Sequence, residues 1–138
     1  MRRFVLDCSV TVAWCFENQA DAYTKGVLGQ LAVSQASVPS LWPFEVANAL
    51  AVGERRNKLT KAETDRFLAI LAGLPIITED QAHHRALDGT LSLAREQTLS
   101  AYDAAYLELA MREGLPLATR DAQLKKAARA VGVLLVPA

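Results

Sequence analysis

The chain has 138 residues, enough for one domain with a sizeable hydrophobic core. Fifteen basic and fifteen acidic residues give a formal net charge of zero, so no overall positive field favours nucleic acid. Cys8 and Cys15 follow no disulfide or metal-binding spacing, and an acid after only three apolar residues excludes a signal peptide at the start. We therefore expect one cytoplasmic domain over residues 1–138, with both thiols buried.

Short apolar runs predict strands, and amphipathic stretches between them predict helices. The expected strands are 4–6, 37–39, 75–78, 117–118 and 133–136. The expected helices are 10–16, one within 20–34, 43–58, one opened by a capping box at 60–63, 81–96, 100–113 and a short one after 121. Because strands alternate with helices, the pattern predicts an α/β fold with three layers. A central, mostly parallel sheet of four to five strands would carry helices on both faces.

Four acidic residues fall at one edge of such a sheet. Asp7 and Asp121 each follow a strand, whereas Glu45 and Asp103 lie near the starts of helices. In open parallel sheets, ligands bind beyond the carboxyl ends of the strands, where these helices begin. Four carboxylates without histidine or cysteine would form a hard oxygen site suited to Mg²⁺ or Mn²⁺ and to phosphodiester hydrolysis.

Asp103 belongs to a helix that is apolar almost all round. Glu108, about 140° away on a helical projection, pairs with Arg112 at i, i+4 spacing, so we expect that face to be solvated. Asp103 then points toward the apolar side. A charge in that position is costly unless it is paired or bound to a metal ion.

Each acid also has a simpler interpretation. Asp7 and Asp121 could be helix N-caps, and Asp103 could complete a capping box. Asp80 imitates Asp121 because it also follows a strand and a threonine; we expect it to cap the next helix. Glu45 is harder to explain in this way, since its neighbours are apolar and no basic residue lies within one turn.

The same acids carry a resemblance to a known family. Four segments resemble the motifs of PIN-domain nucleases, in particular VapC-type toxins: Phe4–Val10, Pro43–Leu50, Ser100–Ala110 and Leu117–Asp121. Their order and spacing, and the total length, match along essentially the whole chain. The resemblance implies a PIN-like fold and a metal-dependent endoribonuclease that acts as the toxin of a type II toxin–antitoxin system.

The resemblance also implies roles for individual residues and partners. It assigns as catalytic residues and ligands of Mg²⁺ or Mn²⁺ the carboxylates of Asp7, Glu45, Asp103 and Asp121. Ser9 and Thr119 match supporting hydroxyl positions near the site. RNA is the implied substrate, a small cognate antitoxin the implied protein partner, and a homodimer the implied assembly.

Other activities remain open at this stage. An aspartyl phosphatase of the haloacid dehalogenase kind needs a second Asp where Ser9 stands. A phosphoacceptor receiver domain needs paired acids after its first strand, and these are missing. A catalytically silent PIN-like binding module and another Mg²⁺-dependent phosphohydrolase stay as alternatives.

Several further residues have surface or core interpretations. Two basic clusters, 55–61 and 125–129, could hold a nucleic-acid backbone or simply be solvated helix faces. His83 and His84 are adjacent on a helix, so they point apart and do not suit a shared metal ion. Core or dimer-interface positions, rather than base-stacking platforms, are expected for Trp14, Trp42, Phe44, Tyr102 and Tyr106.

Overall fold

A computed structural model describes residues 2–136 and contains one parallel sheet of four strands. The strands are β1 (Arg2–Leu6), β2 (Ser34–Pro39), β3 (Ile76–Glu79) and β4 (Leu117–Ala118), in the spatial order β3-β2-β1-β4. Phe4 lies opposite Ala36 in the β1–β2 pair, and Val5 lies opposite Leu117 in the β1–β4 pair. The predicted parallel α/β architecture is confirmed.

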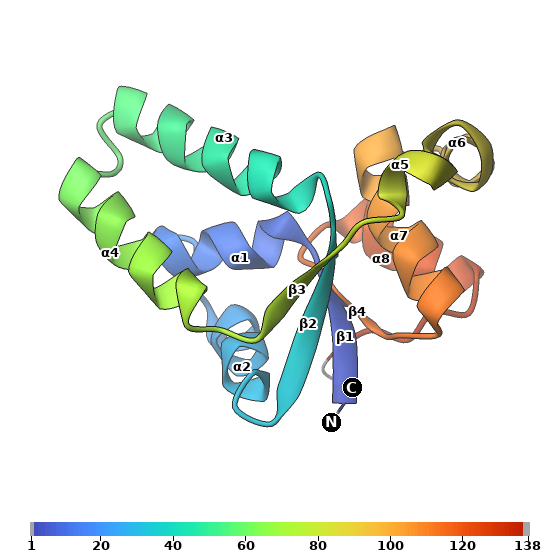
Figure 1. Ribbon diagram of the computed structural model, residues 1–138, viewed down its shortest axis with the longest axis horizontal. Helices are drawn as coiled ribbons and strands as arrows, with labels where there is room; N and C mark the ends of the chain where they lie inside the picture. Colours follow the sequence, from blue (N-terminus) through green and yellow to red (C-terminus); the bar gives the residue numbers. More distant parts are fainter. Residues whose placement is uncertain (1, 137–138) are drawn as a thin grey trace.

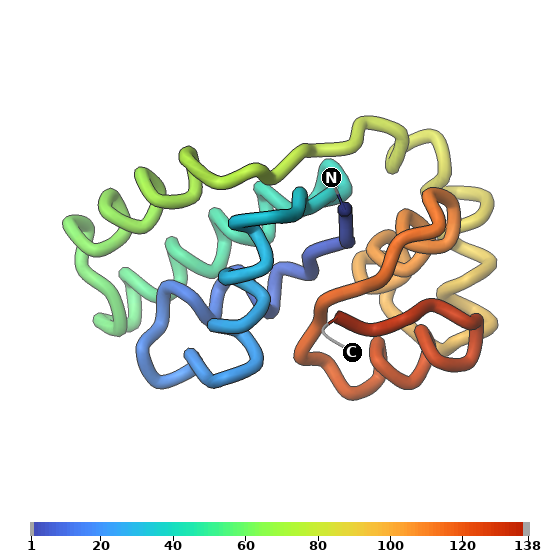
Figure 2. Tube along the Cα trace, turned by 90° about the horizontal axis from the view of Figure 1, so that it is seen from below, coloured from blue at the N-terminus to red at the C-terminus, as the bar shows by residue number. Residues whose placement is uncertain are grey.

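Helices cover both faces of this sheet, which confirms the three-layer prediction. They are α1 (Cys8–Cys15), α2 (Ala22–Gln30), α3 (Trp42–Arg55), α4 (Lys61–Ala72), α5 (Ala82–Arg85), α6 (Leu91–Gln97), α7 (Ala101–Glu113) and α8 (Ala122–Ala130). Helices α1 to α4 lie on one side of the sheet and α5 to α8 on the other, as two perpendicular views agree (Figures 1 and 2). The sheet therefore separates the first half of the helices from the second.

The central strand and helix α7 form the middle of the hydrophobic core. Val5 and Leu6 of β1 are fully buried, as expected for a strand with neighbours on both edges and helices on both faces. Helix α7 contacts β1, β2, β4 and α8, and its residues from Ala104 to Leu107 are all buried. Because α7 is enclosed almost all round, its few polar groups need partners.

Local signals set several helix ends as the sequence predicts. Thr60 and Glu63 form the expected reciprocal capping box at the start of α4. Ser100 caps α7 by accepting a hydrogen bond from the backbone N–H of Asp103. Gly114 ends α7 with a left-handed backbone (φ 66°), which glycine adopts without steric cost.

The long helix expected at 81–96 is wrong in detail. The segment divides into α5, a π-helical stretch η1 (Ala86–Thr90) and α6, and Gly89 lies inside the π-helical stretch. Asp80 does not cap it: the capping position is Gln81, which has no side-chain cap. The carboxylate of Glu79 takes the backbone N–H of Gln81, while that of Asp80 accepts only the side-chain amide of Gln81. The neighbouring acid therefore displaces the predicted cap.

The fifth strand expected at 133–136 is also wrong within the described residues. A single bridge joins Leu117 to Leu135, although the carbonyl of Leu134 and the N–H of Val136 both bond to the backbone of Leu117. Strand β4 contains only two residues, so it offers too short an edge for a full partner strand.

The solvated face expected around Glu108 is a further correction. Glu108 does pair with Arg112 at 3.0 Å, but the two side chains are only 12% and 16% exposed. Arg112 also bonds to Glu79 at 2.9 Å. The η1–α6 segment packs against α7 and covers this ion network.

In residues 2–136, no helix combines the length and apolar character that a membrane span requires.

Candidate functional site

Asp7 is the most buried of the four predicted acids, with 5% exposure. It directly follows β1 and occupies the N-cap position of α1, yet its side chain makes no capping hydrogen bond. Instead, Oδ2 accepts hydrogen bonds from the hydroxyls of Ser9 (2.6 Å) and Thr119 (2.7 Å). The simple capping interpretation of Asp7 is therefore wrong, and its carboxylate is turned toward the end of β4.

Two backbone amides fix the direction in which these hydroxyls donate. The N–H of Arg120 donates to Ser9 Oγ at 3.1 Å, and the N–H of Asp121 donates to Thr119 Oγ1 at 3.0 Å. Each hydroxyl thus accepts a hydrogen bond from a backbone N–H of the loop after β4 and donates its own hydrogen bond to Asp7. This places both predicted supporting hydroxyls against Asp7, while their part in catalysis stays a prediction.

Glu45 lies in the first turn of α3, half-buried, and meets a residue from the opposite side of the sheet. Tyr106 is fully buried in α7, and its hydroxyl donates a 2.5 Å hydrogen bond to Glu45 Oε1. The sequence pattern gives Tyr106 a core or dimer-interface position and no contact with an acid. The signal it offers for this contact is that a buried tyrosine hydroxyl needs an acceptor.

Asp103 and Asp121 differ in how their carboxylates are used. Ser100 caps α7 without a reciprocal bond from Asp103, so within the described residues the Asp103 carboxylate accepts no hydrogen bond. Asp121 does cap α8, because its Oδ1 accepts from the N–H of Leu124 at 2.8 Å. The capping interpretation holds for Asp121 and is wrong for Asp103.

The four carboxylates act on one another electrostatically. Burial raises the pKa of Asp103 to about 6, and the charges of Asp7 and Asp121 add to this rise. Burial also raises the pKa of Glu45; the hydrogen bond from Tyr106 opposes the rise, and the charges of Asp7 and Asp103 add to it. The charge of Asp7 thus raises the pKa of Glu45 and of Asp103, and the charge of Asp121 raises that of Asp7, although the four residues come from separate elements.

Burial and hydrogen bonding also have opposite effects on the pKa of Asp7. Burial raises its pKa, whereas the hydrogen bonds from Ser9 and Thr119 lower it. Burial, together with the charges of Glu45 and Asp7, raises the pKa of the Cys8 thiol to about 12. This direction disfavours the thiolate form that a nucleophilic cysteine needs.

The donor set fits a hard divalent cation in its chemistry. All four groups are carboxylates, and Glu45, Asp103 and Asp121 each keep an oxygen that accepts no hydrogen bond from residues 2–136. Across that same range, no three acidic, histidine or cysteine side chains stand close enough to enclose an ion. The carboxylates would have to draw closer around a cation, so their role as ligands stays a prediction.

The other polar residues singled out in the sequence lie on the surface or are paired with other groups. Asp80 is exposed, and Glu108 is committed to Arg112. His83 and His84 are exposed, with their rings 3.9 Å apart. In the basic cluster 55–61, Lys61 pairs with Asp65. In the basic cluster 125–129, Lys125 lies over the ring of Tyr23.

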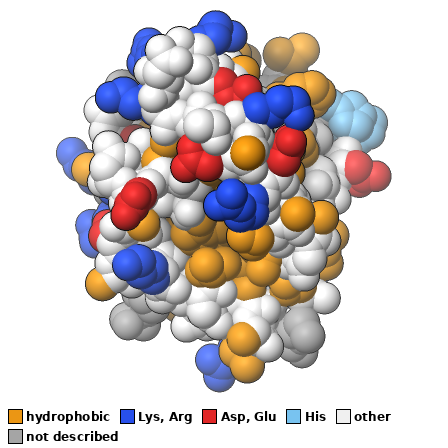
Figure 3. All heavy atoms as spheres, turned by 90° about the vertical axis from the view of Figure 1, so that its left-hand side faces the viewer, with side chains coloured by type: hydrophobic (Ala, Val, Ile, Leu, Met, Phe, Trp, Pro, Cys, Tyr) orange, Lys and Arg blue, Asp and Glu red, His pale blue; other side chains and the backbone are white. Residues whose placement is uncertain are grey.

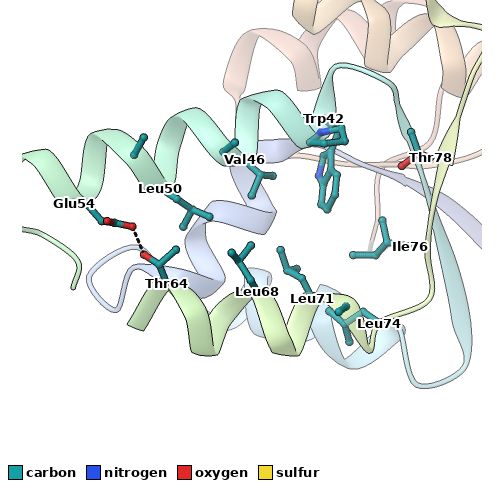
Figure 4. Close-up of a pocket in the computed structure, with 14 residues that line it drawn as sticks. Trp42, Val46, Leu50, Glu54, Thr64, Leu68, Leu71, Leu74, Ile76 and Thr78 are labelled. Atoms are coloured by element: carbon teal, nitrogen blue, oxygen red, sulfur yellow. Dashed lines mark hydrogen bonds between the residues drawn. The ribbon is translucent and has the colours of Figure 1, made fainter. Parts of the chain in front are cut away.

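An apolar groove of about 620 Å³ opens between α3 and α4, and the four acids do not line it. Its lining includes Trp42, Val46, Leu50, Leu68 and Leu71, whose side chains face one another across the two helices (Figure 4). A hydrogen bond from Thr64 to Glu54 closes one end of the groove. The face where α3 ends and α4 begins shows hydrophobic side chains gathered among charged ones (Figure 3).

Comparison with known proteins agrees with this architecture. The family model described as PIN domain matches residues 4–130. The structure of PAE2754 from Pyrobaculum aerophilum is similar, with 24% identity and a TM-score of 0.70 over 98% of this chain and 84% of that one.

Chains of two further solved structures have a similar fold. A toxin–antitoxin complex from Klebsiella pneumoniae aligns at 16% identity and a TM-score of 0.65, over 98% of each chain. VapBC2 from Rickettsia felis, bound to a DNA fragment from its promoter, aligns at 16% identity and 0.63, over 96% of each chain. Curated protein sequences give no significant match. The family model covers nearly the whole chain, and the protein therefore belongs to the PIN-domain family, whose members are nucleases.

Proposed function

We propose that this protein is a metal-dependent endoribonuclease that hydrolyses RNA phosphodiester bonds and acts as the toxin of a toxin–antitoxin pair. One observation carries the proposal: the buried carboxylate of Asp7, held by two hydroxyls, is coupled through its charge to three acids from other elements. PIN-domain nucleases generally use a divalent metal, and a cluster of acids alone would repel a phosphodiester.

Asp7, Glu45, Asp103 and Asp121 would hold Mg²⁺ or Mn²⁺ in this proposal. When bound, such an ion supplies an activated water and neutralises charge on the scissile phosphate. Ser9 and Thr119 keep the Asp7 carboxylate in one orientation, and Tyr106 does the same for Glu45. In-line attack of water on phosphorus would leave a 5′-phosphate and a 3′-hydroxyl.

The test is a cleavage assay on structured RNA with Mg²⁺ or Mn²⁺, compared with EDTA. We expect cleavage only with metal, products with 5′-phosphate ends, and loss of cleavage in Asp7→Asn and Asp103→Asn. Asp80→Asn is the matched control, because Asp80 is an exposed acid outside the set. Full activity of both folded variants would contradict the site, and cleavage in EDTA would contradict the metal requirement. A folded wild type that binds partners without cutting RNA would favour the silent binding module.

We further propose that residues 1–138 form a single cytoplasmic domain that assembles as a homodimer and binds a small antitoxin. The groove between α3 and α4 supports a protein partner, because it is largely apolar and none of the four acids lines it. Substituting Leu68→Asp or Leu71→Asp should abolish inhibition by a co-expressed antitoxin while RNA cleavage persists. Retained inhibition in both variants would place the antitoxin contact elsewhere. Light scattering on the isolated chain measures the assembly.

A further inference from the structure

The protein leaves two of its aromatic side chains strongly exposed. It contains two Trp, three Tyr and four Phe, and all nine of these aromatic residues lie within the described chain. Phe44 is 78% exposed and Tyr102 is 65% exposed. The other seven are buried or partly buried: Phe4, Trp14, Phe16, Tyr23, Trp42, Phe67 and Tyr106. Of the two positions expected for Phe44 and Tyr102, the core is therefore wrong, and the dimer interface stays a prediction.

Both exposed rings are next in sequence to a predicted site residue. Phe44 immediately precedes Glu45 in the first turn of α3, and Tyr102 immediately precedes Asp103 in the first turn of α7. The hydrogen bond from Tyr106 to Glu45 joins α7 to the first turn of α3, so the early turns of the two helices lie near one another. Helices α3 and α7 thus each carry one predicted acid and, one residue before it, one exposed ring.

The direction of Tyr102 follows from the helix that carries it. Tyr102 and Tyr106 are four residues apart, so they lie about 40° apart on one face of α7. The hydroxyl of Tyr106 reaches Glu45, so this face of α7 is turned toward the start of α3. Tyr102, one turn nearer the start of α7, extends beyond the packed part of that face into solvent.

We propose that Phe44 and Tyr102 are stacking platforms for unpaired bases of the RNA on either side of the scissile phosphate. The inference rests on the proposed ribonuclease activity and names how its substrate is held. A chain with no net charge and an acidic site gains little affinity from the phosphate backbone, and aromatic rings supply attraction that charge does not. Proteins recognise single-stranded RNA by stacking its splayed bases on exposed aromatic side chains.

Exposed aliphatic residues provide the controls. Leu134 is 77% exposed, and its carbonyl accepts a hydrogen bond from the N–H of Leu117, the first residue of β4. It therefore lies at the amino end of this strand, whereas the acids lie near the carboxyl ends of the strands. An aliphatic side chain adds apolar area but has no ring face on which a base can stack. Leu134→Ala therefore removes a comparable exposed group without touching the proposed platforms.

The test measures binding of short single-stranded oligoribonucleotides by fluorescence anisotropy in Mg²⁺. Asp103→Asn is the parent protein, since its carboxylate makes no hydrogen bond within residues 2–136 and cleavage should be lost. Adding Phe44→Ala or Tyr102→Ala should weaken binding about fivefold to a hundredfold each. Phe44→Trp and Tyr102→Phe should restore the parent affinity, and Leu134→Ala should retain it.

Oligoribonucleotides with one abasic nucleotide at a time identify the contact. The parent should lose affinity at two positions, and each penalty should disappear in one of the two alanine variants. Quenching of 2-aminopurine at those positions should be lost in the same variants. Equal abasic penalties in the parent and in both alanine variants would overturn the proposal. So would alanine variants whose only change is dissociation of a dimer in sedimentation, because the rings would then belong to a protein interface.

The two proposals fail differently. If wild-type protein cuts RNA but shows no coupling between aromatic rings and abasic positions, the stacking inference is wrong and the ribonuclease stands. If coupling is present but wild-type protein never cuts RNA with Mg²⁺ or Mn²⁺, the nuclease proposal is wrong and the base contacts stand.

Discussion

The hydroxyl of Tyr106 on α7 donates a 2.5 Å hydrogen bond to Glu45 Oε1 on α3, across 61 positions of sequence. The two helices lie on opposite sides of the sheet (Figure 1). The bond therefore joins the two helical layers at the edge where the acids converge. Glu45 is half-buried, so without this donor its carboxylate would lose a favourable contact that water only partly replaces.

Replacing Tyr106 by Phe should lower the free energy of unfolding by about 1–2 kcal/mol, because a hydrogen bond to a charged acceptor is lost while the ring stays packed. The variant should also bind Mn²⁺ more weakly, since Glu45 is no longer held. Urea denaturation and calorimetric titration measure the two effects. Tyr102→Phe is the matched control for stability, because that exposed hydroxyl makes no hydrogen bond within residues 2–136. Equal stability of Tyr106→Phe and wild type would contradict the role given to this bond.

Thr119→Val keeps the shape of a fully buried side chain but removes a donor to Asp7. We expect a loss of about 1.5–3 kcal/mol near pH 7, because the ionised carboxylate depends on its remaining hydroxyl. The native pKa of Asp7 should rise further, so the loss should shrink as the pH falls and the carboxyl takes up a proton. Denaturation at two pH values gives this comparison. A loss of the same size at both values would show that packing, or the lost acceptor for the N–H of Asp121, explains the effect rather than the bond to Asp7.

The metal-free protein should become less stable as the pH rises from about 4 to 7. The native pKa of Asp103 is raised from 3.8 to about 6, and those of Asp7 and Glu45 are also raised. A folded state that holds these protons more tightly than the unfolded state loses stability as they dissociate. Thermal denaturation in EDTA should show this slope, and Asp103→Asn should flatten it. A stability that rises over the same interval in wild type would contradict the coupling.

Arg112 neutralises two largely buried acids, Glu79 and Glu108. Arg112→Leu should cost about 3 kcal/mol, because it leaves two carboxylates without their cation in a poorly hydrated region. Adding Glu108→Leu to Arg112→Leu should recover part of this loss. Chemical denaturation of the single and double variants measures the recovery. If Glu108→Leu destabilises the Arg112→Leu variant as much as it destabilises the wild type, the two residues are not coupled, and this would contradict the network.

Local pattern predicts most of the fold because its signals are strong. Three apolar residues before Asp7 form a central strand, and the Thr60–Glu63 box opens α4 as expected. The segment at 81–96 fails because a regular helical period does not reveal a π-helical stretch around Gly89. The strand at 133–136 fails because strand pairing depends on the length of its partner, which is β4.

The sequence likewise predicts some features of the candidate site and not others. Spacing brings the acids to one edge, since strand ends and helix starts meet there, but it does not distinguish a cap from a free carboxylate. Asp121 caps its helix and Asp103 does not, and only the positions of neighbouring groups decide this. The contact from Tyr106 to Glu45 and the exposure of Phe44 depend on how distant helices pack, which no local pattern contains.

The central claim is that Asp7, Glu45, Asp103 and Asp121 together hold the divalent ion that RNA cleavage requires. Calorimetric titration with Mn²⁺, paired with the cleavage assay on the same samples, tests it most directly. Wild type and Asp80→Asn should bind Mn²⁺ and cut RNA, whereas amide substitution of each of the four acids should weaken Mn²⁺ binding at least about tenfold and abolish cleavage. Folded amide variants of all four acids that bind Mn²⁺ with wild-type affinity would contradict the account.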